Sequence, residues 1–184
     1  MINLKQFLKR DSEVGKILYV GIGEIILGSS CDTLKITSLG SCVGTVLYPD
    51  DDNPEKYAIM GHIMLPESQK VNKKHINDKN RFGSTRFADI AIPTMISKLE
   101  NTTGKHRRKS FVAKMIGGAE MFGYSKLTMK IGKENAQKVK KLLKEANIPL
   151  IKEFIGGDTG MSVDFRISDY TLTIKPTGGK SIII

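Results

Sequence analysis

A cysteine and a histidine are the two residues of this chain whose types and spacing best fit covalent chemistry. Cys42 follows a polar, glycine-containing bend, residues 37–41, and begins an apolar run. His62 comes twenty residues later, inside a second apolar run. A thiol at a tight turn and an imidazole on a nearby strand are the minimum parts of a cysteine nucleophile and its base. A histidine in an apolar strand is more often a core residue, so this hypothesis requires the two runs to be neighbouring strands.

The bend before Cys42 has a second use in such chemistry. A free thiol has a pKa near ~8.5, so little of it is thiolate at neutral pH without a nearby imidazole. The bend can aim backbone N–H groups at a developing oxyanion, and Gly40 makes that approach easier. One such donor contributes about 3–4 kcal/mol where it has been measured in other enzymes. Gly40, Ser41 and Ser38 are therefore candidate substrate-binding residues.

The second cysteine has a different context. Cys31 lies in a polar, turn-like segment, residues 28–32, which indicates a spectator thiol. Two cysteines are too few for a disulfide framework. The cysteines and histidines also lack the close spacing of zinc motifs such as CxxC or HExxH. We therefore predict no metal and no cofactor.

Length and hydropathy describe an ordinary globular chain. Its 184 residues fit one domain, and no apolar run approaches the ~18 residues that a membrane helix needs. Residues 1–14 alternate apolar with charged side chains too often for a secretory signal. The expected location is the cytoplasm, without membrane insertion.

The net charge is the unusual total. It is +10, concentrated in basic runs within residues 70–81, 105–109 and 138–144. Solvated loops and a solvated helix face are the ordinary interpretation, and steering toward an acidic partner is the functional one. Nucleic acid is ranked last, because these runs lack the interleaved aromatic residues that stack on bases.

The elements that must position the site follow from the periodicity of the apolar residues. We expect two helices, one from Ser84 or Thr85 with a kink or break at Pro93, and one over residues 132–146. The glycines of residues 21–24 predict a structural turn, and the pair Gly117 and Gly118 permits either a close backbone approach or a simple turn. About ten strands are expected, over residues 17–20, 25–27, 34–37, 43–48, 57–65, 111–116, 126–129, 150–155, 161–167 and 170–174. Together these elements indicate an α+β fold.

The domain organisation is simple. We expect an N-terminal extension over residues 1–16, a single domain over residues 17–175 and a tail over residues 176–184. The tail either packs on the domain or hangs loose. Residues 69–84 are polar and lysine-rich, which predicts a long loop of the kind that often serves as a lid or binding segment.

Five strings carry a resemblance to a known family. LGSCVG, GHIMLP, RFADIAIP, KMIGGAEMF and IGKENA occur in this order between about Val20 and Phe165, and together they resemble the CheD family of chemoreceptor glutamine deamidases. Any one string is weak evidence, but five in family order form a strong signal. The resemblance implies mixed sheets packed with flanking helices, similar to the catalytic domains of the cytotoxic necrotizing factor toxins.

The resemblance also implies a mechanism. Cys42 would attack the carboxamide carbon of a receptor glutamine, and His62 would protonate the departing ammonia, leaving a thioester. His62 would then activate water to release glutamate, and the same machinery would accept a glutamyl methyl ester. The family has a threonine shortly before the cysteine that orients the histidine. Thr37 is the candidate for that role, with Ser38 as its competitor.

The partners implied by the resemblance are the cytoplasmic domains of chemoreceptors, the methyl-accepting chemotaxis proteins, and a CheC-like phosphatase. Docking on such a phosphatase or on receptors gives an alternative main role, that of a non-catalytic adaptor or regulator. The presence of both Cys42 and His62 favours retained catalysis. A thiol hydrolase with an unrelated substrate is a third and weaker interpretation.

Overall fold

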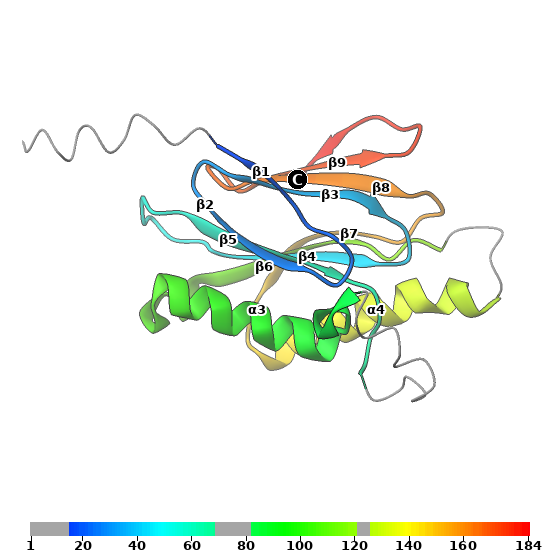
Figure 1. Ribbon diagram of the computed structural model, residues 1–184, viewed down its shortest axis with the longest axis horizontal. Coiled ribbons are helices and arrows are strands. Elements are labelled where there is room, and N and C mark those ends of the chain that lie inside the picture. Colours follow the sequence, from blue (N-terminus) through cyan, green and yellow to red (C-terminus); the bar gives the residue numbers. More distant parts are fainter. Residues whose placement is uncertain (1–14, 69–81, 121–125) are drawn as a thin grey trace, which may run out of the picture.

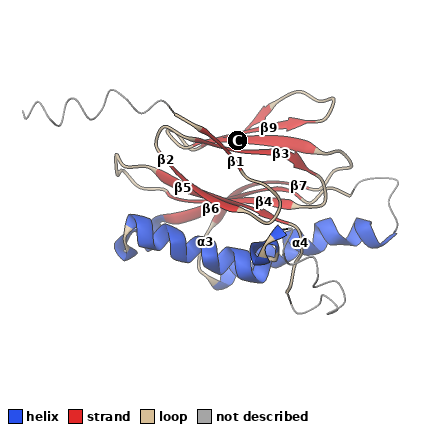
Figure 2. Ribbon diagram, in the orientation of Figure 1, coloured by secondary structure: helices blue, strands red, loops and turns tan. Residues whose placement is uncertain are grey.

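The computed structural model describes residues 15–68, 82–120 and 126–184, which form three layers (Figure 1). A five-stranded sheet, here called the outer sheet, stacks on a second five-stranded sheet, the central sheet. The long helices cover the other face of the central sheet (Figure 2). Mixed sheets with helices gathered on one side make the fold α+β, as predicted.

The strand order is β1-β3-β8-β9-β10 in the outer sheet and β2-β5-β4-β6-β7 in the central sheet. The β1–β3 and β6–β7 pairs are parallel, and the other neighbouring pairs are antiparallel. The outer sheet consists of β1 (Ile17–Tyr19), β3 (Thr33–Leu39), β8 (Met161–Arg166), β9 (Thr171–Pro176) and β10 (Ile182–Ile183). The central sheet consists of β2 (Ile25–Ser29), β4 (Val43–Pro49), β5 (Tyr57–Ile63), β6 (Phe111–Gly117) and β7 (Leu150–Ile155).

Two long helices, α3 (Ala88–Thr103) and α4 (Lys126–Glu145), pack against each other and on the central sheet. Short 3₁₀ helices, η2 (Ser84–Arg86) and η3 (Lys105–Ser110), flank α3. One core lies between the two sheets and a second lies between the central sheet and the helices. Since the central sheet is covered on both faces, every residue of β4 is buried, which explains its largely apolar sequence.

The chain passes from the outer sheet to the central sheet twice, both times at the same end of the strands. β1 and β3 are parallel, and each continues into a central-sheet strand, β2 after residues 20–24 and β4 after residues 40–42. β5 lies between β2 and β4 and runs antiparallel to both. Its C-terminal end therefore lies between the two crossings. This topology brings the two halves of the predicted site to one end of the molecule.

Most of the predicted strands are confirmed, but the strand predicted for residues 126–129 is wrong. These residues form the first turn of α4, which begins before the predicted start at Gly132. Glycine is unfavourable inside helices, so Gly132 suggested a helix boundary. In the structure a Cβ at Gly132 would lie 2.6 Å from the carbonyl oxygen of Gly118. The glycine is there because α4 passes close to the main chain that follows β6.

The other expected elements are found with adjusted boundaries. The helix predicted from Ser84 or Thr85 begins as η2 and continues as α3, and Pro93 lies inside α3 without dividing it. Residues 182–183 pair with β9 as β10, so this part of the tail packs on the outer sheet. Residues 1–14 and 69–81, which include most of the predicted extension and loop, lie outside the described residues.

Candidate active site

Cys42 lies at the second crossing, in the bend immediately before β4. Its side chain is half-buried and packs against the core between the sheets. The carbonyl oxygen of Cys42 accepts a hydrogen bond from the N–H of Gly118 at 2.8 Å, and that of Gly40 accepts one from Ala119 at 2.8 Å. Main-chain hydrogen bonds to the segment after β6 therefore hold the bend in place.

Gly117 explains how that segment comes so close to the cysteine. Its φ is +105°, and a Cβ at this position would lie 2.4 Å from the carbonyl oxygen of Cys42. Only a residue without a side chain fits both the backbone angle and the space. Of the two interpretations of the glycine pair, close backbone approach is the one confirmed.

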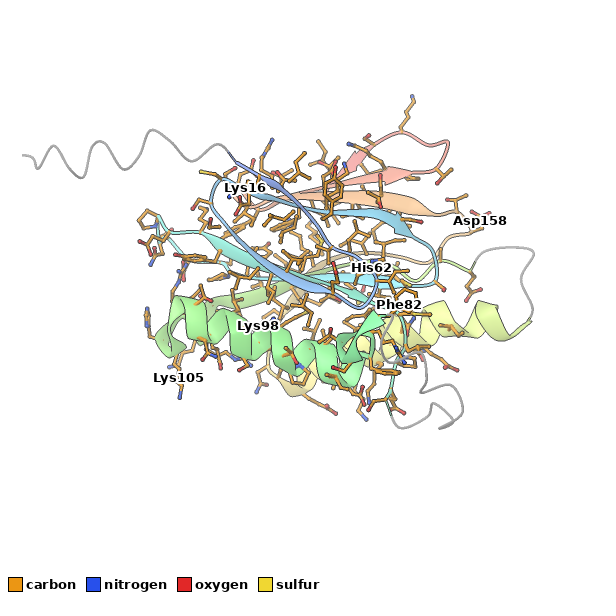
Figure 3. All side chains as sticks on the ribbon, viewed as in Figure 1. Lys16, His62, Phe82, Lys98, Lys105 and Asp158 are labelled. Atoms are coloured by element: carbon orange, nitrogen blue, oxygen red, sulfur yellow. The ribbon has the colours of Figure 1, made fainter. Side chains whose placement is uncertain are left out.

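His62 lies on β5 and is 3% exposed, in the layer between the two sheets (Figure 3). Its backbone N–H and its backbone carbonyl are both hydrogen-bonded to the first crossing. The N–H of Gly23 donates to the His62 carbonyl at 2.9 Å, and the N–H of His62 donates to the Glu24 carbonyl at 3.1 Å. The turn at residues 21–24 is thus structural, as predicted, but what it holds is the histidine.

The His62 ring has one partner and one unpaired nitrogen. Its Nδ1 lies 3.4 Å from the carbonyl oxygen of Val20. A carbonyl oxygen can only accept, so this contact places the proton of the neutral ring on Nδ1 and leaves the lone pair on Nε2. Among the described residues, Nε2 has no hydrogen-bond partner. The ring therefore presents a buried base with a free lone pair.

Cys42 and His62 both lie toward the layer between the two sheets. Cys42 packs against the core of that layer, and His62 is two residues after Met60 of the same core, on the same face of β5. Gly44 lies directly opposite His62, and Cys42 is in the bend two residues before Gly44, so both residues are at the same end of the central sheet. Gly44 puts no side chain beside them. The free Nε2 means that no hydrogen bond joins the pair here, and catalytic contacts in free enzymes often tighten only when substrate binds.

Burial keeps both groups neutral. It raises the pKa of the Cys42 thiol to about 11. It also lowers the pKa of His62 below the ordinary 6.5, although the Val20 carbonyl and the Glu24 charge act in the opposite direction. A neutral thiol beside a neutral imidazole is therefore the resting state.

The two hydroxyl residues predicted to orient the histidine lie at an irregular point of the outer sheet. Thr37 and Ser38 are exposed, where the register of β3 with β8 shifts. The hydrogen bond recorded for the His62 ring goes to Val20, not to either hydroxyl. The orienting role of Thr37 stays a prediction.

The remaining predicted residues, Gly40 and Ser41, form the half-buried bend itself. In the part of the chain that the structure describes, the N–H groups of Gly40, Ser41 and Cys42 donate to no main-chain carbonyl outside the regular elements. Among the residues that the structure describes, the three N–H groups of this bend, just before β4, thus have no main-chain acceptor.

Sequence reasoning missed three residues of this site: Val20, Glu24 and Asn135. Asn135 lies on α4, is fully buried, and donates from Nδ2 to the carbonyl oxygens of Ser41 at 3.1 Å and Met64 at 2.9 Å. Its spacing from the inward-facing Val139, one helical turn away, was the available signal for Asn135. Val20 and Glu24 act through their backbone carbonyls, which no sequence pattern distinguishes.

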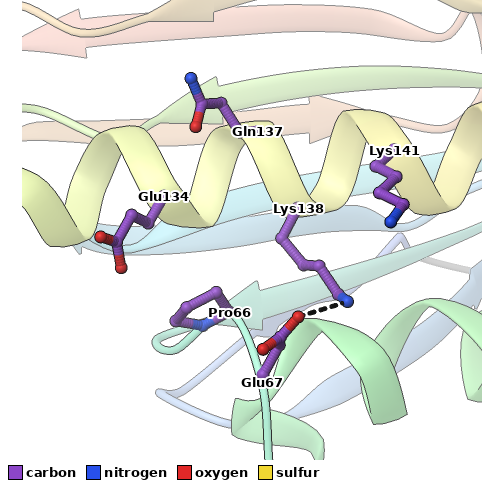
Figure 4. Close-up of a pocket in the computed structure, with 6 residues that line it drawn as sticks. All are labelled: Pro66, Glu67, Glu134, Gln137, Lys138 and Lys141. Atoms are coloured by element: carbon purple, nitrogen blue, oxygen red, sulfur yellow. Dashed lines mark hydrogen bonds and ion pairs between the residues drawn. The ribbon is translucent and has the colours of Figure 1, made fainter. Parts of the chain in front are cut away.

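A separate surface pocket of about 280 Å³ lies between α4 and the segment that follows β5 (Figure 4). An ion pair between Lys138 Nζ and Glu67 Oε1, 2.8 Å long, spans it. Its lining residues are Pro66, Glu67, Glu134, Gln137, Lys138 and Lys141, and they do not include Cys42 or His62. This pocket is distinct from the thiol–imidazole site.

Neither a metal cluster nor a membrane helix is found in the described ranges. Within residues 15–68, 82–120 and 126–184, no three histidine, cysteine or acidic side chains gather as metal ligands would. None of the helices among these residues is long and apolar enough to cross a bilayer. Cys31 is exposed on the turn between β2 and β3, away from the crossings.

Comparison with known proteins identifies the family. The CheD family model, described as CheD chemotactic sensory transduction, matches residues 64–176. A Halalkalibacterium halodurans protein named chemoreceptor glutamine deamidase CheD is 37% identical over 161 residues, which is 86% of this chain and 93% of the relative. Proteins named probable chemoreceptor glutamine deamidase CheD are 40% identical in Clostridium botulinum (86% of this chain, 92% of the relative) and 36% identical in Clostridium acetobutylicum (89% and 92%). With relatives this similar along most of its length, the chain belongs to the CheD family.

Proposed function

We propose that this protein is a protein-glutamine deamidase that converts glutamine side chains of chemoreceptors to glutamate. The observation that supports the proposal is that Cys42 and His62 both lie at the layer between the sheets, at one end of the central sheet, and that His62 Nε2 has no partner among the described residues. The names of the relatives supply the substrate, a chemoreceptor glutamine. The family model begins at residue 64, so it does not cover Cys42 or His62, and their roles are carried over from the family resemblance of LGSCVG and GHIMLP.

In the first half of the reaction, Cys42 Sγ attacks the carbon of the glutamine carboxamide. His62 Nε2 takes the thiol proton as the S–C bond forms, because the thiol is neutral at rest. The oxyanion receives hydrogen bonds from the free N–H groups of the bend, at Gly40, Ser41 and Cys42. His62 then passes its proton to the amide nitrogen, the C–N bond breaks, and ammonia leaves a thioester on Cys42.

In the second half, His62 Nε2 takes a proton from water, whose oxygen attacks the thioester carbon. The S–C bond breaks, the Cys42 thiolate recovers the proton from His62, and glutamate is released. Val20 keeps Nδ1 protonated throughout and so keeps Nε2 available for both proton transfers. A glutamyl methyl ester would react by the same steps with methanol as the leaving group.

Three further parts of the proposal go beyond these contacts. Thr37, with Ser38 as competitor, would help to orient His62 in the substrate complex. The likeness to the catalytic domains of cytotoxic necrotizing factor toxins and the docking of a CheC-like phosphatase are likewise expectations from the family. Full turnover by a Thr37→Ala variant would remove that residue from the mechanism and leave the Val20 carbonyl as the orienting group.

The decisive experiment is mass spectrometry of a chemoreceptor cytoplasmic fragment incubated with this protein or with its Cys42→Ala variant. We expect glutamine-to-glutamate conversion and ammonia release with the wild type, and a loss of at least about 10³-fold with the variant. Equal conversion by both proteins would move the nucleophile elsewhere. Conversion by neither, with folded proteins, would make the adaptor role on receptors or a phosphatase the leading account.

A further inference from the structure

Asn135 links the two segments that carry the catalytic pair. It is 0% exposed, and its Nδ2 group donates to the carbonyl oxygen of Ser41 at 3.1 Å and to that of Met64 at 2.9 Å. Ser41 immediately precedes Cys42, and Met64 follows His62 by two residues. A carboxamide NH₂ has two donors, so this side chain serves one segment with each.

Asn135 connects the β4 and β5 segments beyond the point where their hydrogen-bond ladder ends. The β4–β5 ladder reaches only to the pair Val43 and Ile63. Beyond it, the N–H of Met64 donates to the carbonyl of Arg86, so that β5 is already leaving the sheet. Asn135 therefore continues the cross-strand connection past the end of the ladder, from Ser41, two residues before Val43, to Met64, one residue after Ile63.

Packing alone does not account for an asparagine here. Its helix neighbours Ala136, Val139 and Leu143 belong to the apolar core. Within the described part of the chain, Asn135 Oδ1 is buried without a hydrogen-bond partner, which costs free energy that an apolar side chain of the same size would avoid. Asparagine is also a weaker helix former than leucine. The two donated hydrogen bonds are what an apolar side chain could not replace.

We propose that Asn135 is a positioning residue, which sets the separation of Cys42 and His62 by fixing the carbonyls of Ser41 and Met64. The inference rests on the proposed cysteine chemistry, because it concerns how that pair is aligned. Misalignment of reacting groups by about 1 Å is enough to reduce a rate about 100-fold. The thiol is neutral at rest, so its reactivity depends on a well-placed base.

The test compares Asn135→Leu with Val139→Ala, a change one helical turn away on the same buried face that leaves both hydrogen bonds in place. We expect Asn135→Leu to lower kcat about 10- to 100-fold with KM within about two-fold, while its unfolding midpoint falls no further than that of Val139→Ala, since it loses two hydrogen bonds to main-chain carbonyls. Val139→Ala creates a cavity and should lower the unfolding midpoint while keeping kcat within about two-fold. If Asn135→Leu does not fold, Asn135→Ala, which favours the helix, takes its place.

A second readout keeps this inference separate from the receptor reaction. Iodoacetamide labelling is followed for the Cys42 peptide, with the exposed Cys31 as the reference within the same molecule. Asn135→Leu should slow labelling of Cys42 at least about five-fold relative to Cys31, since His62 no longer accepts the thiol proton efficiently. Unchanged Cys42 labelling and unchanged kcat would overturn the positioning role. If Asn135→Leu slows labelling of Cys42 but the wild type does not deamidate receptors, the positioning role is upheld and the proposed substrate is wrong.

Discussion

The two ends of the β4–β5 hairpin differ in the partners of their polar side chains. At the closed end, residues 50–56, Arg107 of η3 donates to both carboxylate oxygens of Asp51, at 2.8 and 2.7 Å, and Ser110 donates to the same carboxylate at 2.9 Å. Arg107 also donates to the carbonyl of Glu55 at 3.2 Å. Charge is matched by charge, and the hydrogen bonds to Arg107, more than any other contact, hold the pKa of Asp51 at about 2.

At the open end of the same hairpin, the side chains of Cys42 and His62 form no ion pair with any residue that the structure describes. His62 Nε2 and Asn135 Oδ1 are buried without partners among the described residues. The hydrogen bonds that hold the backbone and ring at this end are made by main-chain groups and the Asn135 amide, and within the described ranges the one charge that acts on His62 is the Glu24 carboxylate, which opposes the effect of burial. A fixed charge beside the pair would change its proton affinities, whereas neutral contacts position it and leave the lone pair free. The comparison therefore separates an end held by a charge pair from the end that carries the proposed catalytic residues.

The largest effect should come from the open end. His62→Gln removes the base, and we expect kcat for receptor deamidation to fall about 10²- to 10⁴-fold while the unfolding midpoint changes little. In the wild type, the base is the neutral ring, so activity should persist below pH 6.5 and fall as pH drops through the lowered pKa of His62. Ammonia release measured from pH 5 to 8 checks both statements. An activity that survives in His62→Gln, or an acid limb above pH 6.5, would contradict the assignment.

The closed end should affect stability and leave activity unchanged. Arg107→Met breaks the pair with Asp51, and because that carboxylate is partly exposed we expect a loss of about 1–3 kcal/mol in the free energy of unfolding, with kcat within about two-fold. The lowered pKa of Asp51 stabilises the fold above pH 3.8, and this stabilisation is lost as pH falls through about 2. The variant's deficit should therefore shrink below pH 3.8. Urea unfolding at pH 7 and pH 3 measures it, and a deficit independent of pH would contradict this account.

The placement of Cys42 and His62 at one end of the central sheet was within reach of the sequence for a physical reason. Two apolar runs joined by the short acidic turn at residues 50–56 form a hairpin, which brings the start of the first run beside the end of the second. The glycines and the order of the motifs pointed to the same site. These signals are local, or depend on one hairpin.

The rest of the site depends on tertiary contacts that no local pattern encodes. The carbonyl of Val20 reaches the His62 ring only because β1 and β3 are parallel and both cross at one edge. Gly132 suggested the start of a helix. It is a glycine for another reason, because the main chain at Gly118 lies too close to leave room for a side chain. Arg107 was assigned to a solvated basic run, yet it is 6% exposed. The sequence did not reveal this, because the carboxylate that it binds, Asp51, is 56 residues away. Each error arose where a distant segment decided the environment of the residue.

The smallest effect should come from the second thiol, which is near the closed end. Ser30, next to Cys31, exchanges hydrogen bonds with the main chain of Lys56 at the end of that turn. Cys31→Ser should therefore leave kcat within about two-fold, as expected for an exposed side chain outside the catalytic site. In the wild type at pH 8, iodoacetamide should modify Cys31 at least about ten-fold faster than Cys42, because burial raises the pKa of Cys42 to about 11 and little thiolate is present. Peptide mass spectrometry over a time course gives both rates. Faster labelling of Cys42 would mean that the pair rests as thiolate and imidazolium, and the open end would then hold a charge pair of its own, which would erase the contrast between the two ends.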